Sequence, residues 1–287
     1  MHFPVCIKIN TMTDYLQRAK YFRTKKRLGQ NFLINSEVIS DIIKFADIKP
    51  DDIILEIGPG VGFVTEQLVK YAKKVIAVEL DEEAVKELSK LNANNLEIIH
   101  ADILKTDLAE LCNGKLKVVA NIPYYITSPI IAHLLGEIDD LGNKNRATIE
   151  NIILMVQEEV ARRIVATEKS AGKQYGLLTI LSQFWADCSI LRLVGRKSFY
   201  PAPKVNSALV SMKVREKPLL DLQDYTFFRK VIKAGFSQRR KTLKNCLLSA
   251  GFEKEKINQA ISQMKLDENI RGEKLSIKDF GELSKLL

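Results

Sequence analysis

Short apolar runs separated by amphipathic stretches fill the centre of this chain, and they constrain its fold more than any other feature. Five runs are rich in β-branched residues: 53–58, 74–80, 96–102, 116–121 and 150–157. Such runs are typical of strands that are buried on both faces. Helical patterns lie between them, including 81–91 and 128–136, the second with Ser128 at its cap, Pro129 at its first position and Gly136 at its end. The alternation predicts an α/β fold with a parallel, doubly wound sheet.

The chain ends in a different pattern. A helix near 176–187 precedes two last apolar runs, 188–194 and 208–214, which are close enough in sequence to pair as neighbours. From about Pro218 onward there are four helical segments and no predicted strand: 227–236, 240–252, 254–264 and 276–287. The last begins with Ser-Ile-Lys-Asp, which resembles an N-terminal capping box with Asp in place of the usual Glu. We therefore predict a small all-helical C-terminal domain over residues 218–287.

Charge is distributed unevenly along the chain. The net charge is +9; residues 1–30 hold seven basic residues and one acidic residue, and residues 218–287 hold fourteen basic and nine acidic residues. A nearly neutral centre between two basic ends is typical of a ligand-binding core whose periphery binds a polyanion. A generally basic surface would give the same composition, so charge alone leaves both interpretations open.

Composition argues against several functional classes. No apolar run reaches the ~18 residues that a membrane span needs, and the first residues lack the features of a secretory signal. The four cysteines form no Cys-x-x-Cys pair, which favours free thiols in a reducing compartment. The three histidines show no metal-ligand spacing. We therefore expect a cytoplasmic protein without a membrane anchor, a metal centre or a Ser-His or Cys-His nucleophile.

A glycine-rich turn follows the first predicted strand. In LEIGPGVGFVTEQL, three glycines (Gly58, Gly60 and Gly62) stand between the strand and a helix. Glycines at this place let the backbone approach a ligand closely, and the helix N-terminus favours polar or anionic groups. The spacing is Gly-x-Gly-x-Gly, which differs from the Gly-x-Gly-x-x-Gly of dinucleotide-binding proteins. An NAD site or plain packing would also use such a turn.

Acidic residues end the strands around this turn. Glu79 ends the second strand, where its carboxylate would accept hydrogen bonds from both ribose hydroxyls. Asp102 ends the third strand, where it would accept one from an adenine amino group. This order of groups suits an adenosine-bearing cofactor without a pyrophosphate. S-adenosylmethionine fits, because Glu56 and Glu79 tolerate a cationic sulfonium better than a pyrophosphate.

The fourth strand leads into the sequence NIPYYITSPI, which begins at Asn121. The exocyclic nitrogen of adenine is a poor nucleophile, and two acceptors on its N–H groups would draw its lone pair out of conjugation with the ring. The Asn121 side-chain oxygen is one candidate, and the Ile122 carbonyl, aimed by the geometry before Pro123, is the other. Tyr124 would stack on the base. The alternative is an ordinary turn that ends a strand and is followed by two core aromatics.

The loop KSFYPAPKVNS supplies a second aromatic candidate. Phe199 precedes two prolines that would stiffen the loop and present the ring, so that Phe199 and Tyr124 would sandwich one base. An ordinary core Phe beside a proline-rich turn explains the same residues. We predict packing roles for Trp185 and His133, which lie in helical patterns.

Together these residues resemble the ribosomal RNA adenine dimethyltransferase family of the KsgA type. The matching motifs are RLGQNFL (27–33), EIGPGVGFVT (56–65), VELD (78–81), HADIL (100–104), NIPYYITSPI (121–130), MVQEEVARRI (155–164), FYPAPKVNSALV (199–210) and FSQRRKTLKNCL (236–247). Ile122 stands where the bacterial family more often has Leu, but only its carbonyl is used. The resemblance implies a Rossmann-like S-adenosylmethionine methyltransferase domain over 27–217, after a basic N-terminal extension over 1–26.

The resemblance also implies the site. Its cofactor contacts would be Asn31, Leu33, Glu56, Gly58, Gly60, Gly62, Glu79, Leu80, Asp102, Ile103 and Asn121. Asn121, Ile122 and Pro123 would hold the target amine, with Tyr124 and Phe199 as the stacking groups. The implied activity is dimethylation of the N6 nitrogens of two adjacent adenosines in the hairpin near the 3′ end of small-subunit rRNA, by a monomer that acts on a pre-30S-type particle during subunit biogenesis.

A related group of antibiotic-resistance methyltransferases acts on large-subunit rRNA and shares the cofactor motifs. FSQRRKTLKNCL resembles the small-subunit branch. The stretch 229–244 contains seven basic residues and no acidic one: Arg229, Lys230, Lys233, Arg239, Arg240, Lys241 and Lys244. We predict that they contact rRNA phosphates, although a solvated helix face is the common explanation for such a run.

Three other classes of protein would show different sequence features from those of an rRNA adenine dimethyltransferase. An NAD-dependent dehydrogenase would show the other glycine spacing and a catalytic His or Tyr-Lys pair. A non-catalytic assembly factor would show damaged cofactor or amine-binding motifs, which here are intact. A DNA adenine methyltransferase would more often show Asn/Asp-Pro-Pro-Tyr and a large DNA-recognition domain.

Overall fold

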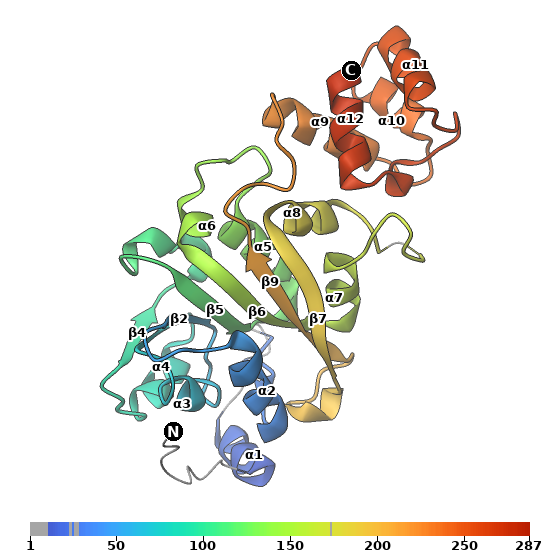
Figure 1. The fold of residues 1–287 in the computed structure, drawn as a ribbon. Helices are drawn as coiled ribbons and strands as arrows, with labels where there is room; N and C mark the ends of the chain where they lie inside the picture. The colour runs from blue at the N-terminus through green and yellow to red at the C-terminus, as the bar shows by residue number, and fades with distance from the viewer. Residues whose placement is uncertain (1–10, 23–24, 26–28, 173) are drawn as a thin grey trace, which may run out of the picture.

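A seven-stranded sheet forms the centre of the computed structural model, which describes residues 11–22, 25, 29–172 and 174–287 (Figure 1). Its strands are β2 (Ile53–Ile57), β3 (Lys74–Glu79), β4 (Leu96–His100), β5 (Leu116–Asn121), β6 (Ile149–Gln157), β7 (Ala186–Val194) and β9 (Ser207–Val214). They lie in the order β4-β3-β2-β5-β6-β9-β7. The first five are parallel, and β9 is antiparallel to both of its neighbours, β6 and β7. The predicted α/β fold and the pairing of the last two strands are confirmed.

The sheet separates two hydrophobic clusters. Alternate residues of one strand enter different clusters: Leu55 and Ile57 belong to one and Ile54 to the other. Since both faces are covered, the parallel strands are nearly continuous apolar runs, as expected for strands between two helical layers. Helices α5 (Thr127–Leu135), α7 (Glu158–Ile164) and α8 (Leu177–Trp185) contribute to the first cluster, and α2 (Ser36–Ala46) and α3 (Thr65–Leu68) to the second. The remaining helices before β7 are α1 (Met12–Tyr21), α4 (Glu82–Ser89) and α6 (Lys144–Thr148).

Helix α5 begins earlier than the sequence predicts. Ser128 was expected to be its cap, but the helix starts at Thr127, directly after a 3₁₀ turn over Tyr124–Ile126. Proline is therefore at the third helical position, where a backbone N–H has no partner within the helix and none is lost. The helix ends at Gly136 with a φ of 73°, as predicted.

Two residues predicted to pack have structural contacts. Trp185 is buried, and the Arg146 guanidinium lies 3.4 Å from its ring centroid while donating hydrogen bonds to the carbonyls of 135, 140 and 141. His133 Nε2 lies 3.0 Å from the Thr106 carbonyl oxygen. Through Arg146, Trp185 at the end of α8 is connected to the end of α5, and His133 connects α5 to the Thr106 carbonyl.

The chain after β9 is helical, as predicted. It forms α9 (Tyr225–Gly235), α10 (Leu243–Ser249), α11 (Lys254–Gln263) and α12 (Ile277–Leu286), which lie at one end of the molecule (Figure 1). Helix α10 starts three residues later than expected, because Thr242 caps it. The capping box is confirmed: Ser276 Oγ accepts from the Asp279 N–H, and the Asp279 carboxylate accepts from the Ser276 N–H.

These helices share a core with the sheet domain. Phe228 of α9 is fully buried, and its ring centroid lies 5.6 Å from that of Phe184 in α8. The first hydrophobic cluster is therefore continuous from the strands into α12. Among the described residues, no helix is long and apolar enough to cross a membrane.

Candidate active site

A cavity opens at the carboxyl ends of β2, β3 and β5, and its volume including the mouth is about 1040 Å³. Ligands of open parallel sheets bind at this edge. The cavity is lined by residues of all the predicted cofactor motifs, because the end of each parallel strand reaches the same edge.

The glycine turn after β2 forms one wall. Gly58 and Gly60 have φ values of 66° and 57°, which lie in the left-handed region that favours glycine. A Cβ on Gly60 would lie 2.8 Å from the Phe32 ring, whereas a Cβ on Gly58 would meet nothing closer than the Asn121 carbonyl oxygen at 4.0 Å. The lack of a side chain at Gly60 therefore lets the Phe32 ring pack closely against the turn, and the lack of one at Gly58 leaves space in the cavity.

Gly62 packs against α4 and is not among the residues that line the cavity. A Cβ there would lie 2.7 Å from the Leu88 side chain of α4. Gly62 therefore has a packing role, and its contact with the cofactor stays a prediction. Its lack of a side chain lets α4 pack against the turn, and sequence spacing alone cannot distinguish this from ligand contact.

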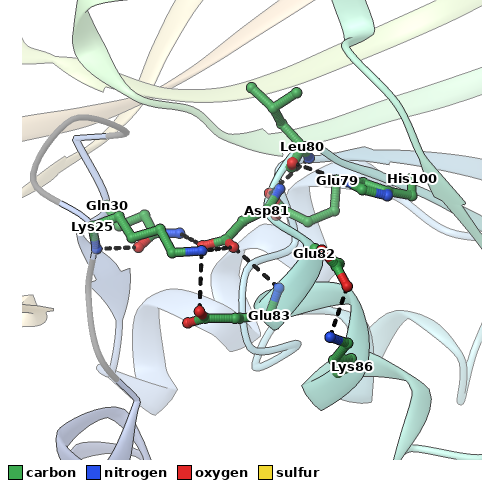
Figure 2. Close-up of polar contacts among 9 residues, drawn as sticks. All are labelled: Lys25, Gln30, Glu79, Leu80, Asp81, Glu82, Glu83, Lys86 and His100. Atoms are coloured by element: carbon green, nitrogen blue, oxygen red, sulfur yellow. Dashed lines mark hydrogen bonds and ion pairs between the residues drawn. The ribbon is translucent and has the colours of Figure 1, made fainter.

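The Glu79 carboxylate organises the cavity floor. Its Oε2 accepts from the Gly60 N–H at 2.9 Å, and its Oε1 accepts from the N–H groups of Leu80 and Asp81, both at 2.8 Å (Figure 2). The pKa of Glu79 is raised overall, because burial outweighs the lowering by these three backbone donors. A carboxylate offers about four acceptor positions, so one position remains for a ligand hydroxyl. The sequence did not reveal that Glu79 also fixes the glycine turn.

Two further carboxyl groups line the cavity. Glu56 is buried, and its pKa is raised to about 8: burial is the main cause, a hydrogen bond from Thr65 opposes it, and the Glu79 charge adds to it. Asp102 caps a 3₁₀ turn, with Oδ1 accepting from the Leu104 N–H at 3.0 Å. A cationic ligand would favour the ionised form of Glu56.

The Asn121 amide is oriented by the N-terminal segment. Its Nδ2 donates to the Asn31 carbonyl at 3.2 Å, which leaves the side-chain oxygen as the group available to a ligand. Asn121 ends β5, and Ile122, Pro123 and Tyr124 follow it along the cavity wall. The structure thus brings these four predicted residues together.

Tyr124 is anchored at its hydroxyl. The hydroxyl lies 2.6 Å from Ser207 Oγ, at the start of β9, and burial raises the pKa of this tyrosine. The neighbouring Tyr125, which the sequence analysis treated only as a candidate core residue, is 61% exposed and lines the cavity mouth. The repeated Tyr in NIPYY was the available signal.

Phe199 lies outside the cavity. It is 2% exposed and belongs to β8 (Phe199–Tyr200), which pairs with β1 (Phe32–Leu33), so that Phe199 is opposite Leu33. The expected sandwich of a base between Phe199 and Tyr124 is therefore not formed in this structure. The Phe199 ring packs in the same hydrophobic cluster as Phe32 and Leu33 of the N-terminal segment. The motif FYPAPKVNSALV reaches the cavity through Ser207, whose hydroxyl contacts Tyr124.

The N-terminal segment completes the enclosure. Asn31 and Leu33 line the cavity, as do Leu80 and Ile103, in agreement with their predicted places. Gln30 and Lys25 contact Asp81 at the start of α4 (Figure 2), and none of the three is among the predicted site residues. Asp81 follows the second strand and precedes a helix, which is an N-cap signal. Positions 1–10, 23–24 and 26–28, and with them the first two residues of RLGQNFL, lie outside the described part of the chain.

The seven basic residues of 229–244 do not form one helix face. They are spread over α9, a turn and α10, and Lys233, Arg240 and Lys241 are exposed. Arg229 instead pairs with Glu137 at 3.0 Å and Asp139 at 3.4 Å, so it has acidic partners although the stretch itself contains no acidic residue. Lys230 lies 5.0 Å from the Phe252 ring centroid. The acids come from a distant part of the sequence, so a local count missed them.

In the part of the chain that the structure describes, no group of three His, Cys, Asp or Glu side chains is arranged to hold a metal ion. The polar groups at the cavity include three side-chain amides, three carboxyl groups and backbone atoms. They can hold a nucleoside-like ligand by hydrogen bonds and stabilise a positive charge next to it.

Comparison with known proteins adds a family. A model of the family described as ribosomal RNA adenine dimethylase matches residues 21–287. A Clostridium botulinum protein named ribosomal RNA small subunit methyltransferase A is 40% identical over 267 residues, which cover 92% of this chain and 94% of the relative. A Clostridioides difficile protein of the same name is 40% identical over 286 residues, covering 97% and 95%.

Two solved structures share the fold. A dimethyladenosine transferase from Plasmodium falciparum superposes with a TM-score of 0.71 at 29% identity, covering 87% of this chain and 94% of its own. The 23S rRNA methyltransferase ErmE superposes with a TM-score of 0.68 at 26% identity, covering 90% and 99%. Since the family model spans nearly the whole chain and both relatives are matched almost end to end, this chain belongs to the ribosomal RNA adenine dimethylase family.

Proposed function

We propose that the protein dimethylates the N6 nitrogens of two adjacent adenosines in the hairpin near the 3′ end of small-subunit rRNA, with S-adenosylmethionine as methyl donor. The observation that carries the proposal is the Asn121 amide. Its nitrogen is engaged by the Asn31 carbonyl, and its oxygen is left at the end of β5 in the same cavity as Glu79 and Asp102. An acceptor fixed in this way is suited to an adenine amino group.

The residues present fit the cofactor. The room left by Gly58, the acceptor position left on Glu79 and the carboxyl group of Asp102 match a nucleoside, and Glu56 lies in the same cavity to balance a cationic part. When bound, S-adenosylmethionine supplies a methyl group activated by its sulfonium. The proposed cofactor contacts are Asn31, Leu33, Glu56, Gly58, Gly60, Glu79, Leu80, Asp102, Ile103 and Asn121.

The chain would act by positioning and by hydrogen bonding. The Asn121 oxygen and the Ile122 carbonyl would accept from the two N–H groups of the amine and direct its lone pair away from the ring. Tyr124, held by Ser207, would stack on the base. Because the nitrogen becomes acidic as it gains a methyl group, no strong base is needed, and the proton passes to solvent. The rate gain would come from alignment.

The small-subunit branch is favoured by the relatives. Proteins that are 40% identical carry the name ribosomal RNA small subunit methyltransferase A, whereas the large-subunit enzyme ErmE is 26% identical and has nearly the same fold score as the dimethyladenosine transferase. The TM-scores therefore do not distinguish the small-subunit branch from the large-subunit branch, whereas the sequence identities favour the small-subunit branch. We propose residues 27–217 as the transferase part and 218–287 as an rRNA-binding part of a cytoplasmic monomer that binds a small-subunit particle.

The test is methyl transfer from labelled S-adenosylmethionine to small subunits that lack the modification, followed by digestion and identification of nucleosides by mass. We expect N6,N6-dimethyladenosine at both positions of the 3′ hairpin. Label confined to large-subunit rRNA would assign the resistance branch. Tight subunit binding without any transfer would identify a non-catalytic assembly factor.

A further inference from the structure

We propose that Asp81 is a positioning residue for the transfer reaction: through Gln30 it sets the Asn121 amide, and through its own backbone it sets Glu79. The inference rests on the proposed function. Asp81 does not line the cavity, so it would act only through other residues.

The Asp81 carboxylate is buried and accepts three hydrogen bonds. Oδ1 accepts from Lys25 Nζ at 2.6 Å and from the Glu83 N–H at 3.1 Å, and Oδ2 accepts from Gln30 Nε2 at 2.7 Å (Figure 2). Burial alone would raise the pKa of Asp81, but the hydrogen bonds from Lys25, Gln30 and the Glu83 N–H, together with the Lys25 charge, outweigh it and lower the pKa. The group therefore stays ionised and holds its partners by charge-assisted hydrogen bonds, which are the stronger kind.

Gln30 is fixed at both ends of its side-chain amide. Its Nε2 donates to Asp81, and its Oε1 accepts from the Lys25 N–H at 2.8 Å. The backbone at Gln30 therefore has little freedom. The next residue, Asn31, has its side chain donating to the Gly29 carbonyl at 2.9 Å, and its own carbonyl accepts from Asn121 Nδ2. Asp81, Gln30, Asn31 and Asn121 form a continuous path of covalent and hydrogen bonds.

A second path leads from Asp81 to the cofactor side. Its backbone N–H donates to Glu79 Oε1 at 2.8 Å, and Glu79 Oε2 accepts from the Gly60 N–H. One residue thus fixes the acceptor proposed for the amine and the acceptor proposed for the ribose. Both must be placed together for in-line transfer, and a displacement of about 1 Å can cost roughly 100-fold in rate.

The second methylation should depend on this path more than the first. The unmodified amine offers two N–H groups to its acceptors, whereas the monomethylated amine offers one. When Asn121 loses its fixed orientation, only the Ile122 carbonyl is left as a pre-set acceptor. The unmodified amine can place either of its two N–H groups there, whereas the monomethylated amine has a single N–H and therefore one way to bind. We therefore expect variants in the path to release more N6-methyladenosine relative to the dimethylated product.

The experiment is a pair exchange in the full-length protein. Gln30→Glu would place two carboxylates in contact, and we expect about 10-fold or greater loss of kcat/KM, weaker binding of S-adenosylhomocysteine by calorimetry and a higher share of monomethyl product. Adding Asp81→Asn restores a donor and an acceptor across the contact, and Asn caps a helix as well as Asp. We expect the double variant to recover at least half of the lost log activity and the dimethyl product.

The control is Asp107→Asn, since Asp107 caps a 3₁₀ turn by accepting from the Ala109 N–H and does not line the cavity. It should leave kinetics and product ratio unchanged. Wild-type product ratio and cofactor affinity in Gln30→Glu would overturn the inference, and so would a double variant no better than the single one. A wild-type protein without transfer activity would instead overturn the proposed function, and the calorimetric comparison would still test the path.

Discussion

The carboxyl edge of the sheet and the C-terminal helices place polar side chains by different means. At the edge, Glu79 and Asn121 end buried strands, and backbone groups hold their side chains. In the helices, Lys233, Arg240 and Lys241 lie on the surface, while Arg229 is drawn to Glu137 and Asp139. Strand ends thus fix which groups meet, whereas surface charges are placed by partners far away in the sequence.

The largest effect is expected at the edge. We predict that Asn121→Ala lowers methyl transfer by about 10³-fold or more, because the aligned acceptor is lost, and leaves rRNA binding within about twofold. Single-turnover transfer and filter binding on the same subunits measure the two quantities. Turnover close to wild type would remove Asn121 from the chemistry and with it the contrast between the two regions.

Deleting a shared core residue tests whether the regions are energetically separate. Phe228→Ala should destabilise the protein by about 3–5 kcal/mol, because a fully buried ring is removed. Urea unfolding should keep a single transition, since one hydrophobic cluster spans both regions. Phe227→Ala, whose ring is only partly buried, is the matched control and should lose less. Two separated transitions in the wild type would show that the helices fold independently.

The surface cations should have a moderate effect. Replacing Arg240 and Lys241 by Gln should weaken small-subunit binding by roughly 10-fold and lower the slope of log affinity against log salt by about 1–2, since each phosphate contact contributes ~0.7–0.9. Arg229→Gln is the control: its guanidinium is already paired with acids, so the salt slope should change less. Equal slopes for the wild type and the double variant would exclude this turn from the RNA interface.

The stability of the protein should also depend on pH through the edge itself, in small steps spread over several pH units. The raised pKa of Glu56, about 8, means that the folded protein binds its proton more tightly than an unfolded chain, in which the group has a pKa of about 4.5. Its contribution to stability is therefore full below pH ~4.5 and is lost as pH rises toward 8, by at most about 1.4 kcal/mol per pH unit. Glu56→Gln should flatten this slope in thermal unfolding.

Cofactor binding should show the opposite slope for the same reason. A cationic ligand favours ionised Glu56, so affinity should rise with pH up to about 8 and then level off. Calorimetry in buffers of different ionisation enthalpy would report the released proton. Proton release that persists unchanged in Glu56→Gln would assign it to another group.

The sequence predicts most of the edge because parallel strands end together. Glu79 and Asn121 at the ends of β3 and β5 therefore meet once the α/β alternation is recognised. Asp102 was expected to end the third strand, but β4 ends at His100 and Asp102 caps the next turn; all three line the cavity. The surroundings of Gly62 and Phe199 could not be predicted. Spacing does not tell which side of a turn Gly62 faces, and the two-residue pairing of β1 with β8, which joins positions 32–33 to 199–200, is a long-range contact.

The hydrogen bonds of Gln30 and Lys25 with Asp81 could not be predicted for the same reason, since each of them joins residues more than 50 positions apart in sequence. Only the capping role of Asp81 is a local signal. Long-range partners of polar side chains, including those of Arg229, are decided by tertiary packing, which a one-dimensional pattern does not contain.

The direction of β5 has a practical consequence. The strand begins beside Gly114, an exposed glycine with open space around it, and ends at Asn121. Six residues of strand separate this loop from the cavity edge by roughly 20 Å. A fluorophore or an affinity handle attached at the loop would lie on the side of the sheet away from the ligand. The protein can therefore be tethered or labelled there for single-particle observation while the opposite edge remains open to the ribosome.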